Sequence, residues 1–536
     1  MATDLREGRR AHMRTKHLFS FLVLASLSCG TFGGSSDETT SPAPPPEDPS
    51  KPPVIIEGER LTGAFVSSSR GGEGADGSES RPFKTIKEAM VLAQQRGERV
   101  IVCAEQFDEN VELLEGVSLY GYFDCTTSPW SKTTKHAVVI SPNADPSLAV
   151  TKLEKPVRVE GFDFIGPDQT QRIAGVTAAS TAVLVRDSKD VAFVEVTIRG
   201  GKGTNGANGA PPTKANTFSG NPNGTASVKQ KVCPQFANCN TNVFIGGAGG
   251  IATCAVGQSR PGGRGGEGAT MTPTNQEVLP PPPFGPADAR GHGFAATLEL
   301  AKGGVYSGTE GAAGANGVPG QSGTNGVWSF SRDGFLPGDG SPGQPGVPGQ
   351  GGGGGGGAGA CWRSTAGQCA APGGTSVVWT STGAGGGAGG CGGLPGTPGR
   401  GGGASIGLFV VDSMVKIERS KIEGGDGGAA GAGSLGGAGL PGGAGGEGGP
   451  YPNVVAEWYA WAGRGGAGGA GGPGGVSGHG APGPSIGLVW TGTRPEIAAD
   501  VVLAGGKAGA GHPALAHPNA QGIPAVVGDV KSEHSF

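Results

Sequence analysis

The chain has 536 residues, of which 111 are glycine and 42 are proline, together about 29% of the total. Such a content without a repeat is typical of low complexity or disorder, while 35% hydrophobic and 16% charged residues argue against a membrane-spanning bundle and against one large conventional core. The formal net charge of −4 gives no reason to expect a nucleic acid as partner.

The N-terminus has the pattern of an export signal. Five basic residues between positions 6 and 16 precede the apolar run 18–27, which is too short to cross a bilayer. Ser28 and Cys29 then resemble the cleavage site of bacterial lipoproteins, with simple secretion and an incidental cysteine as the alternative. We therefore expect a signal peptide at 1–28, lipid attachment at Cys29, a Gly/Ser/Pro-rich tether at 29–53 and a membrane partner reached through the lipid.

The pattern of residues 54–199 predicts a series of short strands. Apolar-alternating runs occur at 100–103, 111–114, 117–123, 137–140 and 157–165, separated by turn residues, which is typical of a sandwich, a barrel or a β-solenoid. Between Thr85 and Arg96 the apolar spacing changes to i, i+3, i+4, i+7, and Gly97 follows. This pattern predicts one helix in an otherwise all-β domain.

The segment PFKTIKEAMVLA at 82–93 and the segment VELLEGVSLYGYFDC at 111–125 resemble the entry segment and first coils of pectate-lyase-like proteins. The resemblance implies a right-handed parallel β-helix in which the helix at 85–96 caps the N-terminal end of the coil stack. It also implies a disulfide between Cys103 and Cys125, because their separation of 22 residues is about one coil and neighbouring coils lie ~4.8 Å apart.

Three later segments repeat one design: 182–203, 406–427 and 486–508 each have an apolar strand, a polar turn, a second alternating strand and a Gly-Gly pair. Such repeats are typical of successive solenoid coils with insertions on one face. We therefore expect Gly-rich insertions at 200–404, a coil at 405–426, a Gly-rich hairpin arm at 427–484, and a terminal coil and tail at 485–536.

Residues 200–483, which include the insertions, hold 87 of the 111 glycines, many in a period of three. Glycine recurs at every third position over 308–326, 340–352, 387–402, 433–448 and 463–478. A period of three is that of polyproline II, and a glycine stripe allows such helices to approach until their amides pair. We favour polyproline-II-like (polyglycine-II) arms within one chain; a collagen-like trimer and disordered linkers are the alternatives.

Eight cysteines remain after Cys29, an even number that suits disulfides in an oxidising compartment. Six lie in the Gly-rich part, where cross-links would offset a thin apolar core: Cys233, Cys239, Cys254, Cys361, Cys369 and Cys391. Their connectivity cannot be read from the sequence.

No catalytic, metal or cofactor site stands out. The candidate acid/base carboxylates are Asp163, Asp187, Asp190, Glu195, Asp412 and Asp426. Asp187 and Asp412 stand where a strand meets a turn, a position at which Asp more often caps the turn, and the histidines show no metal-ligand spacing. Aromatic residues gather at two places between glycine stretches: Trp328 and Phe330 at one, and Tyr451, Trp458, Tyr459 and Trp461 at the other. They suggest a contact surface for a glycan or a protein. The alternative is that they fold back and close the ends of the packed glycine-rich arms.

The sequence thus predicts a bacterial cell-envelope protein, either an outer-membrane lipoprotein or an extracellular protein, with a structural or adhesive role. Its possible partners are a glycan or a cell-surface protein. A polysaccharide-active enzyme of the pectate-lyase-like superfamily and an ice- or surface-binding protein are the alternatives.

Overall fold

The structure is a computed structural model that describes residues 50–52, 61–169, 178–227, 229–232, 246–256, 260–266, 270–271, 277–278, 298–301, 305–361, 378–449, 461–517 and 520–536. These residues belong to one compact unit, 48–536. The expected signal peptide, the tether up to residue 49 and Cys29 lie outside the described residues.

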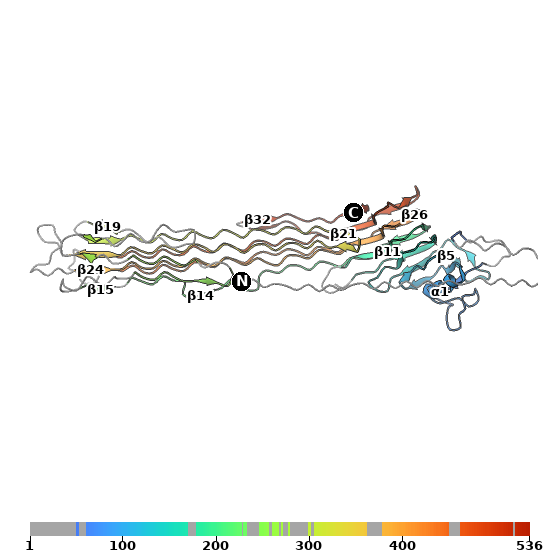
Figure 1. The fold of residues 1–536 in the computed structure, drawn as a ribbon, viewed down its shortest axis with the longest axis horizontal. Coiled ribbons are helices and arrows are strands. Elements are labelled where there is room, and N and C mark those ends of the chain that lie inside the picture. Colours follow the sequence, from blue (N-terminus) through green and yellow to red (C-terminus); the bar gives the residue numbers. More distant parts are fainter. Residues whose placement is uncertain are drawn as a thin grey trace, which may run out of the picture. The chain divides into compact units, whose positions relative to one another are not determined.

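The described chain is nearly all β, with one helix and three sheets built mainly from parallel strands (Figure 1). The first sheet contains β1 (Ala64–Val66), β2 (Val100–Cys103), β5 (Leu119–Asp124), β9 (Val157–Glu160), β12 (Val191–Val194), β26 (Val415–Glu418) and β29 (Glu496–Ile497), with β6 (Ser131–Lys132) antiparallel to β5. The second contains β3 (Gln106–Asp108), β7 (Ala137–Ile140), β10 (Phe162–Ile165), β13 (Thr197–Arg199), β27 (Lys421–Glu423) and β30 (Val502–Ala504). The third contains β4 (Val111–Glu112), β8 (Leu148–Thr151), β11 (Ser180–Arg186), β25 (Ser405–Val411), β28 (Ser485–Thr491) and β33 (Val530–Ser535).

From β2 onward the chain passes through the first, second and third sheets in the same order each time. The three repeated segments therefore lie in register: Val183 pairs with Leu408, and Leu408 pairs with Leu488. Each repeat contains three strands, not the two expected from the sequence, because β12 and β13 are separated by a turn at Glu195, where φ is 49°.

The run 157–165, expected as one strand, is likewise divided between two sheets. Gly161 separates β9 from β10 and has a φ of 75°, a left-handed conformation that glycine adopts without strain. Apolar alternation continues across this corner, so the sequence pattern alone does not show it.

Helix α1 (Ile86–Arg96) confirms the helix expected from the apolar spacing. Thr85 and Glu88 form a capping box, in which the Thr85 side chain accepts the Glu88 N–H and the Glu88 carboxylate accepts the Thr85 N–H. Gly97 ends the helix in the left-handed conformation, with φ 65°. Ile86 and Met90 are buried against the apolar cluster inside the sheets.

We expect the Thr85→Ala substitution to lower the free energy of unfolding by about 1 kcal/mol, because it removes the side-chain acceptor of the capping box. The measurement is chemical denaturation of the purified chain, with Lys87→Ala as control, since Lys87 is exposed and contributes only its backbone N–H to a hydrogen bond with Glu109. Equal stability of the two variants would contradict this role of Thr85.

The core between the three sheets is aliphatic and aromatic. Successive strands place buried side chains above one another, as in the row Val159, Phe193 and Ile417. Phe162 and Phe164 stack in the same cluster with ring centroids 5.4 Å apart. Among the described residues, a compact apolar core therefore exists only where the parallel sheets are.

Outside these sheets the strands are short and antiparallel. A five-stranded sheet contains β15 (Lys229–Val232), β24 (Val378–Ser381), β23 (Ala358–Cys361), β20 (Val305–Gly308) and β19 (Leu298–Ala301), in that order. Four strand pairs complete the list: β14 (Phe218–Ser219) with β16 (Thr253–Cys254), β17 (Thr270–Met271) with β18 (Glu277–Val278), β21 (Ser329–Ser331) with β22 (Gly334–Leu336), and β31 (Leu515–His517) with β32 (Ala520–Ile523).

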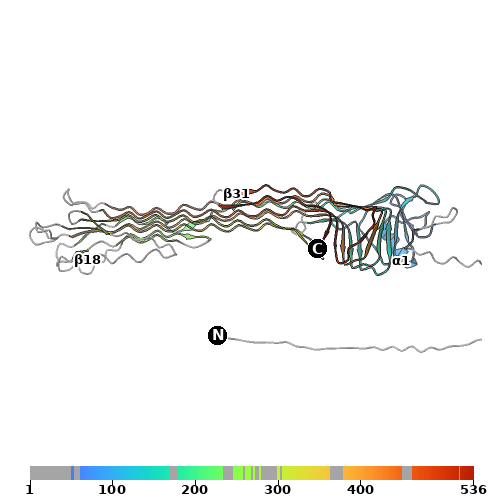
Figure 2. The same cartoon turned by 90° about the horizontal axis from the view of Figure 1, so that it is seen from above.

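The glycine-rich segments lie side by side between the parallel sheets and the five-stranded sheet, in both views (Figures 1 and 2). We call them the glycine bundle: 201–227, 246–256, 260–266, 308–326, 338–357, 382–403, 424–449, 462–484 and 505–513. Each segment is named below as a run by its residue numbers.

Candidate functional site

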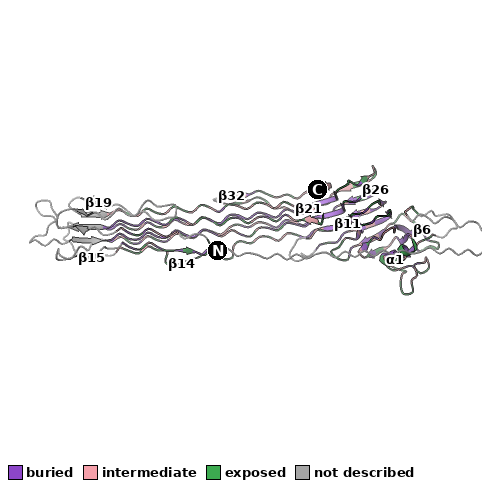
Figure 3. Cartoon of the chain, in the orientation of Figure 1, coloured by how far each residue is buried: buried purple, intermediate pink, exposed green. Residues whose placement is uncertain are grey.

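Backbone hydrogen bonds join the runs of the glycine bundle at intervals of three residues. Four of the runs that bond to run 462–484 illustrate this. The bonds are Gly466 N–H to Gly353 O (2.8 Å), Gly468 N–H to Gly443 O (2.9 Å), Gly314 N–H to Ala467 O (2.8 Å) and Gly390 N–H to Gly469 O (2.8 Å). The amide pairing expected between runs is therefore present, and it forms within one chain. Figure 3 shows that burial is concentrated in the inner runs.

A glycine series is a set of glycines at every third position of a run. A run with more close neighbours has more such series. Run 462–484 has two series: 463, 466, 469, 472, 475 and 478 donate to run 338–357, while 465, 468, 471, 474, 480 and 483 donate to run 424–449. A Cβ added to Gly466 or Gly468 would overlap a backbone carbonyl of a neighbouring run. Run 308–326 has one series, and most residues between its glycines are exposed or half-buried. The period of three noted in the sequence corresponds to only one of the two series of run 462–484.

Asn-Gly pairs hold the runs in register. At Asn316-Gly317, the Asn side-chain oxygen accepts the N–H of Ala470 (2.9 Å) and the Gly N–H donates to the carbonyl of the same Ala470 (2.8 Å). Four further pairs do the same: Asn205-Gly206 on Ala429, Asn208-Gly209 on Ala432, Asn223-Gly224 on Ala444, and Asn325-Gly326 on His479. The Asn-Gly dipeptide within a glycine series is the sequence signal for this contact, and it is absent from the expectations above.

Prolines of run 338–357 occupy a position whose amide is not needed. The residues on either side of each proline donate to neighbouring runs, as Val347 does to Val318 O (3.0 Å) and Gly349 to Gly390 O (2.9 Å), while Pro348 between them has no N–H. Pro342 and Pro345 occupy the same phase. Proline therefore stiffens the run without leaving a donor unpaired.

Buried serines join the bundle to the parallel sheets. Ser405 at the start of β25 donates to Gly201 O (2.6 Å) and accepts the N–H of Gly425 (2.7 Å). Ser485 at the start of β28 repeats this with Gly425 O and the N–H of Gly506. Each Gly-Gly pair of the repeated segments is thus fixed where the chain leaves the sheets.

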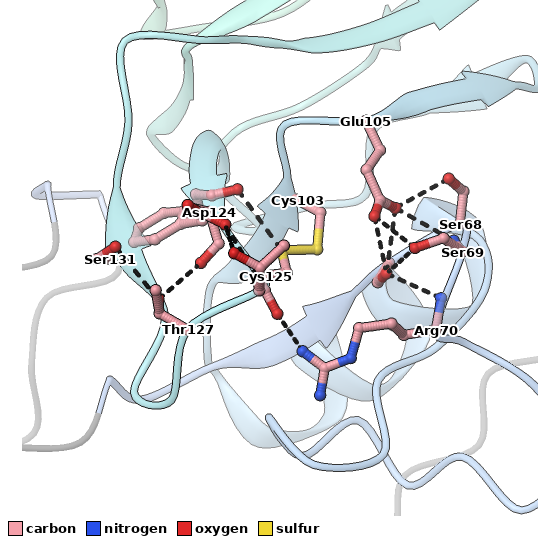
Figure 4. The surroundings of a disulfide bond; sticks show 12 residues. Ser68, Ser69, Arg70, Cys103, Glu105, Asp124, Cys125, Thr127 and Ser131 are labelled. Atoms are coloured by element: carbon pink, nitrogen blue, oxygen red, sulfur yellow. Dashed lines mark hydrogen bonds between the residues drawn. A yellow bond between two sulfur atoms is a disulfide. The ribbon is translucent and has the colours of Figure 1, made fainter.

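Two disulfides are present among the described residues. Cys103 and Cys125, the pair implied by the family resemblance, are bonded beside the first sheet, with Cα atoms 5.7 Å apart (Figure 4). In the same view Arg70 donates to the Cys125 carbonyl, and the Glu105 carboxylate accepts from Ser68 and Ser69. These serines lower the pKa of Glu105 against the opposing effect of its burial.

The second disulfide joins Cys254 to Cys391 inside the glycine bundle, again with 5.7 Å between the Cα atoms. Cys391 is fully buried in run 382–403. Cys233, Cys239 and Cys369 lie outside the described residues, as does the side chain of Cys361, so their disulfides stay a prediction.

Trp328 and Phe330 lie on the third sheet. The hairpin β21–β22 packs against β25 and β33, where Phe330 stacks on Phe536 (ring centroids 5.7 Å apart) and contacts Phe409 (6.0 Å). Trp328 lies against His534 (5.3 Å) in the same aromatic cluster. These two side chains therefore stabilise the fold at the base of the bundle, and a binding role for them stays a prediction.

The second aromatic group falls mostly outside the described residues, which include Trp461 but not Tyr451, Trp458 or Tyr459. Trp461 lies directly before run 462–484 and is 54% exposed. This exposure distinguishes it from Trp328 and Phe330, which are half-buried in their aromatic cluster.

Two histidines stack between runs. His479 and His512 have ring centroids 5.4 Å apart, and His479 is almost fully buried. Its Nδ1 accepts the N–H of Gly433 (2.9 Å), so its Nε2 carries the proton donated to the Pro513 carbonyl (3.0 Å). Burial, with a smaller contribution from His512, lowers the pKa of His479.

We expect this part of the bundle to lose stability as the pH falls below about 6.5, the unperturbed histidine pKa. The unfolded chain binds a proton at His479 more readily than the folded chain, so stability is complete above that pH and decreases toward the lowered folded pKa. Hydrogen exchange of the Gly433 amide at pH 7.5 and 5.0 tests this, after correction for intrinsic exchange rates. The His479→Asn variant should show a smaller pH dependence, and an unchanged one would contradict the role of His479.

Four of the candidate carboxylates contact basic side chains. Asp163 contacts His136 Nδ1 (3.0 Å), and this bond raises the pKa of His136; Glu195 pairs with Arg419 (2.8 Å). The structure brings Asp187 and Asp412 together around Arg332, at corners where φ is 49° and 44°. These positions serve turns and coil stacking, as the sequence indicated for Asp187 and Asp412.

A cavity of about 500 Å³ lies where the bundle meets the sheets, lined by Asp168, Gln169, Lys202, Thr204, Asn205 and Asp426 among others. Asp168 accepts the Lys202 N–H (2.8 Å), so its carboxylate is already engaged. In the described part of the chain no three His, Cys, Asp or Glu side chains form a metal-binding group. Within those same residues, no helix has the length and apolarity to span a membrane.

No family model, curated protein or solved structure matches this chain.

Proposed function

We propose that the chain is an exported, lipid-anchored bacterial cell-surface protein with a structural or adhesive role. In this proposal the three sheets are a right-handed parallel β-helix, α1 is its N-terminal cap, and the glycine bundle is a set of polyglycine-II arms. The observation that carries the proposal is the bundle itself: backbone hydrogen bonds in regular rows and an internal disulfide make a stiff element with little chemistry of its own.

Two features support export. Disulfides persist in oxidising compartments, and both Cys103–Cys125 and Cys254–Cys391 connect parts of the described fold. The export signal at 1–28 and Cys29 in the sequence fit the same location, and lipid attached there would place the protein at a membrane surface.

The adhesive role rests on the far end of the hairpin formed by runs 424–449 and 462–484. These runs pair with each other from Gly428 and Gly483 outward. The sequence between them contains Tyr451, Trp458 and Tyr459, and Trp461 at its end is exposed. Aromatic side chains with one exposed face suit stacking on sugar rings or anchoring in a protein surface.

Lipid attachment is tested by expressing the full chain and its Cys29→Ser variant in a Gram-negative host with radiolabelled palmitate. We expect the unchanged chain to be labelled and to fractionate with the outer membrane, and the variant to lose both properties. An unlabelled wild-type chain in the culture medium would contradict the anchor while leaving export in place.

Adhesion is tested by binding of the intact mature chain to bacterial cells and to a glycan array. The Trp458→Ala/Trp461→Ala double variant should fold normally and lose binding. Val327→Ala is the control, because Val327 is 85% exposed at the hairpin near the third sheet. Equal binding by the double variant would contradict an adhesive tip and leave the structural role.

A further inference from the structure

The C-terminal run 505–513 shows how the bundle accepts one more extended segment. Gly427 donates its N–H to the Lys507 carbonyl (2.8 Å), and Ala430 donates to the Ala510 carbonyl (2.8 Å). In return Gly509 donates its N–H to the Gly483 carbonyl (2.9 Å). The segment is thus held by amides from run 424–449 and by a carbonyl from run 462–484.

The amides of run 424–449 and the carbonyls of run 462–484 that hold this segment belong to two rows, and both rows continue along their runs with a period of three. Stepping from Gly427 along run 424–449 leads to Gly439, Gly442 and Gly445, and stepping from Gly483 along run 462–484 leads to Gly471, Gly468 and Gly465. The two runs stay paired in one register over this length, since Gly483 donates to Gly428 and Gly468 donates to Gly443. The three more distant pairs of glycines therefore repeat the geometry that holds residues 505–510.

These repeats are not used by the described chain. Among the described residues, the amides of Gly439, Gly442 and Gly445 donate to no acceptor, and the carbonyls of Gly465, Gly468 and Gly471 accept no N–H. All six glycines are only partly buried. His479 joins runs 424–449 and 505–513 at residue 513, because its side chain accepts the Gly433 N–H and donates to the Pro513 carbonyl.

We propose that this open edge, defined by Gly439, Gly442 and Gly445 with Gly465, Gly468 and Gly471, binds an extended glycine-repeat segment of another protein. The segment would add one run to the bundle, as a peptide adds a strand to the free edge of a sheet. Its carbonyls would accept the three amides, and its own amides would donate to the three carbonyls.

The bound C-terminal run 505–513 also indicates which sequence a partner segment needs. A Cβ at Gly509 would overlap the Gly428 carbonyl, so the residue that donates to run 462–484 has to be glycine. Lys507 and Ala508, which precede it, are exposed and half-buried respectively, so these two positions tolerate side chains. The partner segment therefore has glycine at every third residue over at least three repeats.

The test uses the full mature chain and the synthetic peptide (Lys-Ala-Gly)5, which repeats residues 507–509. Hydrogen exchange of the segment 437–449 is measured with and without peptide. We expect the amides of Gly439, Gly442 and Gly445 to lose their fast exchange when the peptide binds, while those of Gly311, Gly314 and Gly317, already hydrogen-bonded, stay unchanged.

The control peptide (Lys-Ala-Ala)5 has the same charge and should give no protection, because its additional Cβ atoms would meet the carbonyls of run 424–449. Equal protection by both peptides would contradict the proposed edge and indicate attraction by lysine alone. No protection by either peptide would overturn the proposal. Protection that increases with protein concentration without peptide would also overturn it, in favour of a second copy of the chain.

Discussion

Replacement of Gly468 by Ala is expected to lower the stability of the glycine bundle by about 3 kcal/mol, a large effect for one methyl group. The Cβ would overlap the carbonyl oxygen of Ala388, and the obstacle is backbone, which has no rotamer to change. Run 382–403, to which Ala388 belongs, is itself enclosed by other runs, so it cannot move aside without breaking further bonds.

The matched control is Gly437→Ala in run 424–449. There the nearest atom to an added Cβ is Pro212 Cγ at 3.1 Å, and the nearest backbone atom is 3.6 Å away. Because Ala lowers the entropy of the unfolded chain, this variant should be neutral or up to about 1 kcal/mol more stable. Differential scanning calorimetry compares the two, and a similar melting temperature for both would mean that the runs are not closely packed in solution.

Gly468 and Gly437 both lie in glycine-rich runs and differ in their neighbours, which limits what the sequence can predict about the bundle. The period of three indicates extended runs that approach one another, and the structure has them. The sequence does not show which runs are neighbours, because every glycine series has the same period. That information comes from contacts such as the Asn316 side chain with Ala470, between residues 154 positions apart.

The parallel sheets were more accessible to sequence reasoning because their signals are local. Apolar alternation locates β2 and β7, and the helical spacing locates α1 with its capping Thr85. A local pattern does not show a corner that interrupts it, such as Gly161 between β9 and β10. It also does not show the place of Phe330, whose cluster with Phe536 forms only once the intervening runs are packed.

The disulfide pairing of the cysteines in the bundle likewise depends on which runs are neighbours. The resemblance gave Cys103–Cys125 because the spacing of 22 residues is local to one coil. Cys254–Cys391 has a spacing of 137 residues, and its choice of partner depends on how runs 246–256 and 382–403 pack. Hydrogen bonds such as Gly250 N–H to Gly386 O (2.8 Å) bring these runs together.

Loss of the Cys254–Cys391 disulfide is expected to be the most damaging single change to the bundle. Closing a loop of 137 residues contributes about 5 kcal/mol in the chain-entropy description, compared with about 3 kcal/mol for the 22-residue loop of Cys103–Cys125. The bundle has little apolar core to compensate, because its inner positions are mostly glycine. The Cys254→Ala/Cys391→Ala variant should therefore melt at a lower temperature than the Cys103→Ala/Cys125→Ala variant.

The two variants should also differ in where protection is lost. Without Cys254–Cys391, hydrogen exchange is expected to increase in runs 246–256 and 382–403 and in the neighbouring run 462–484, while β2 and β5 stay protected. Without Cys103–Cys125, the increase should be confined to the first sheet, where the apolar core limits its extent. Exchange that rises equally throughout both variants would mean that bundle and sheets unfold as one unit, and that the cross-link does not act on the bundle separately.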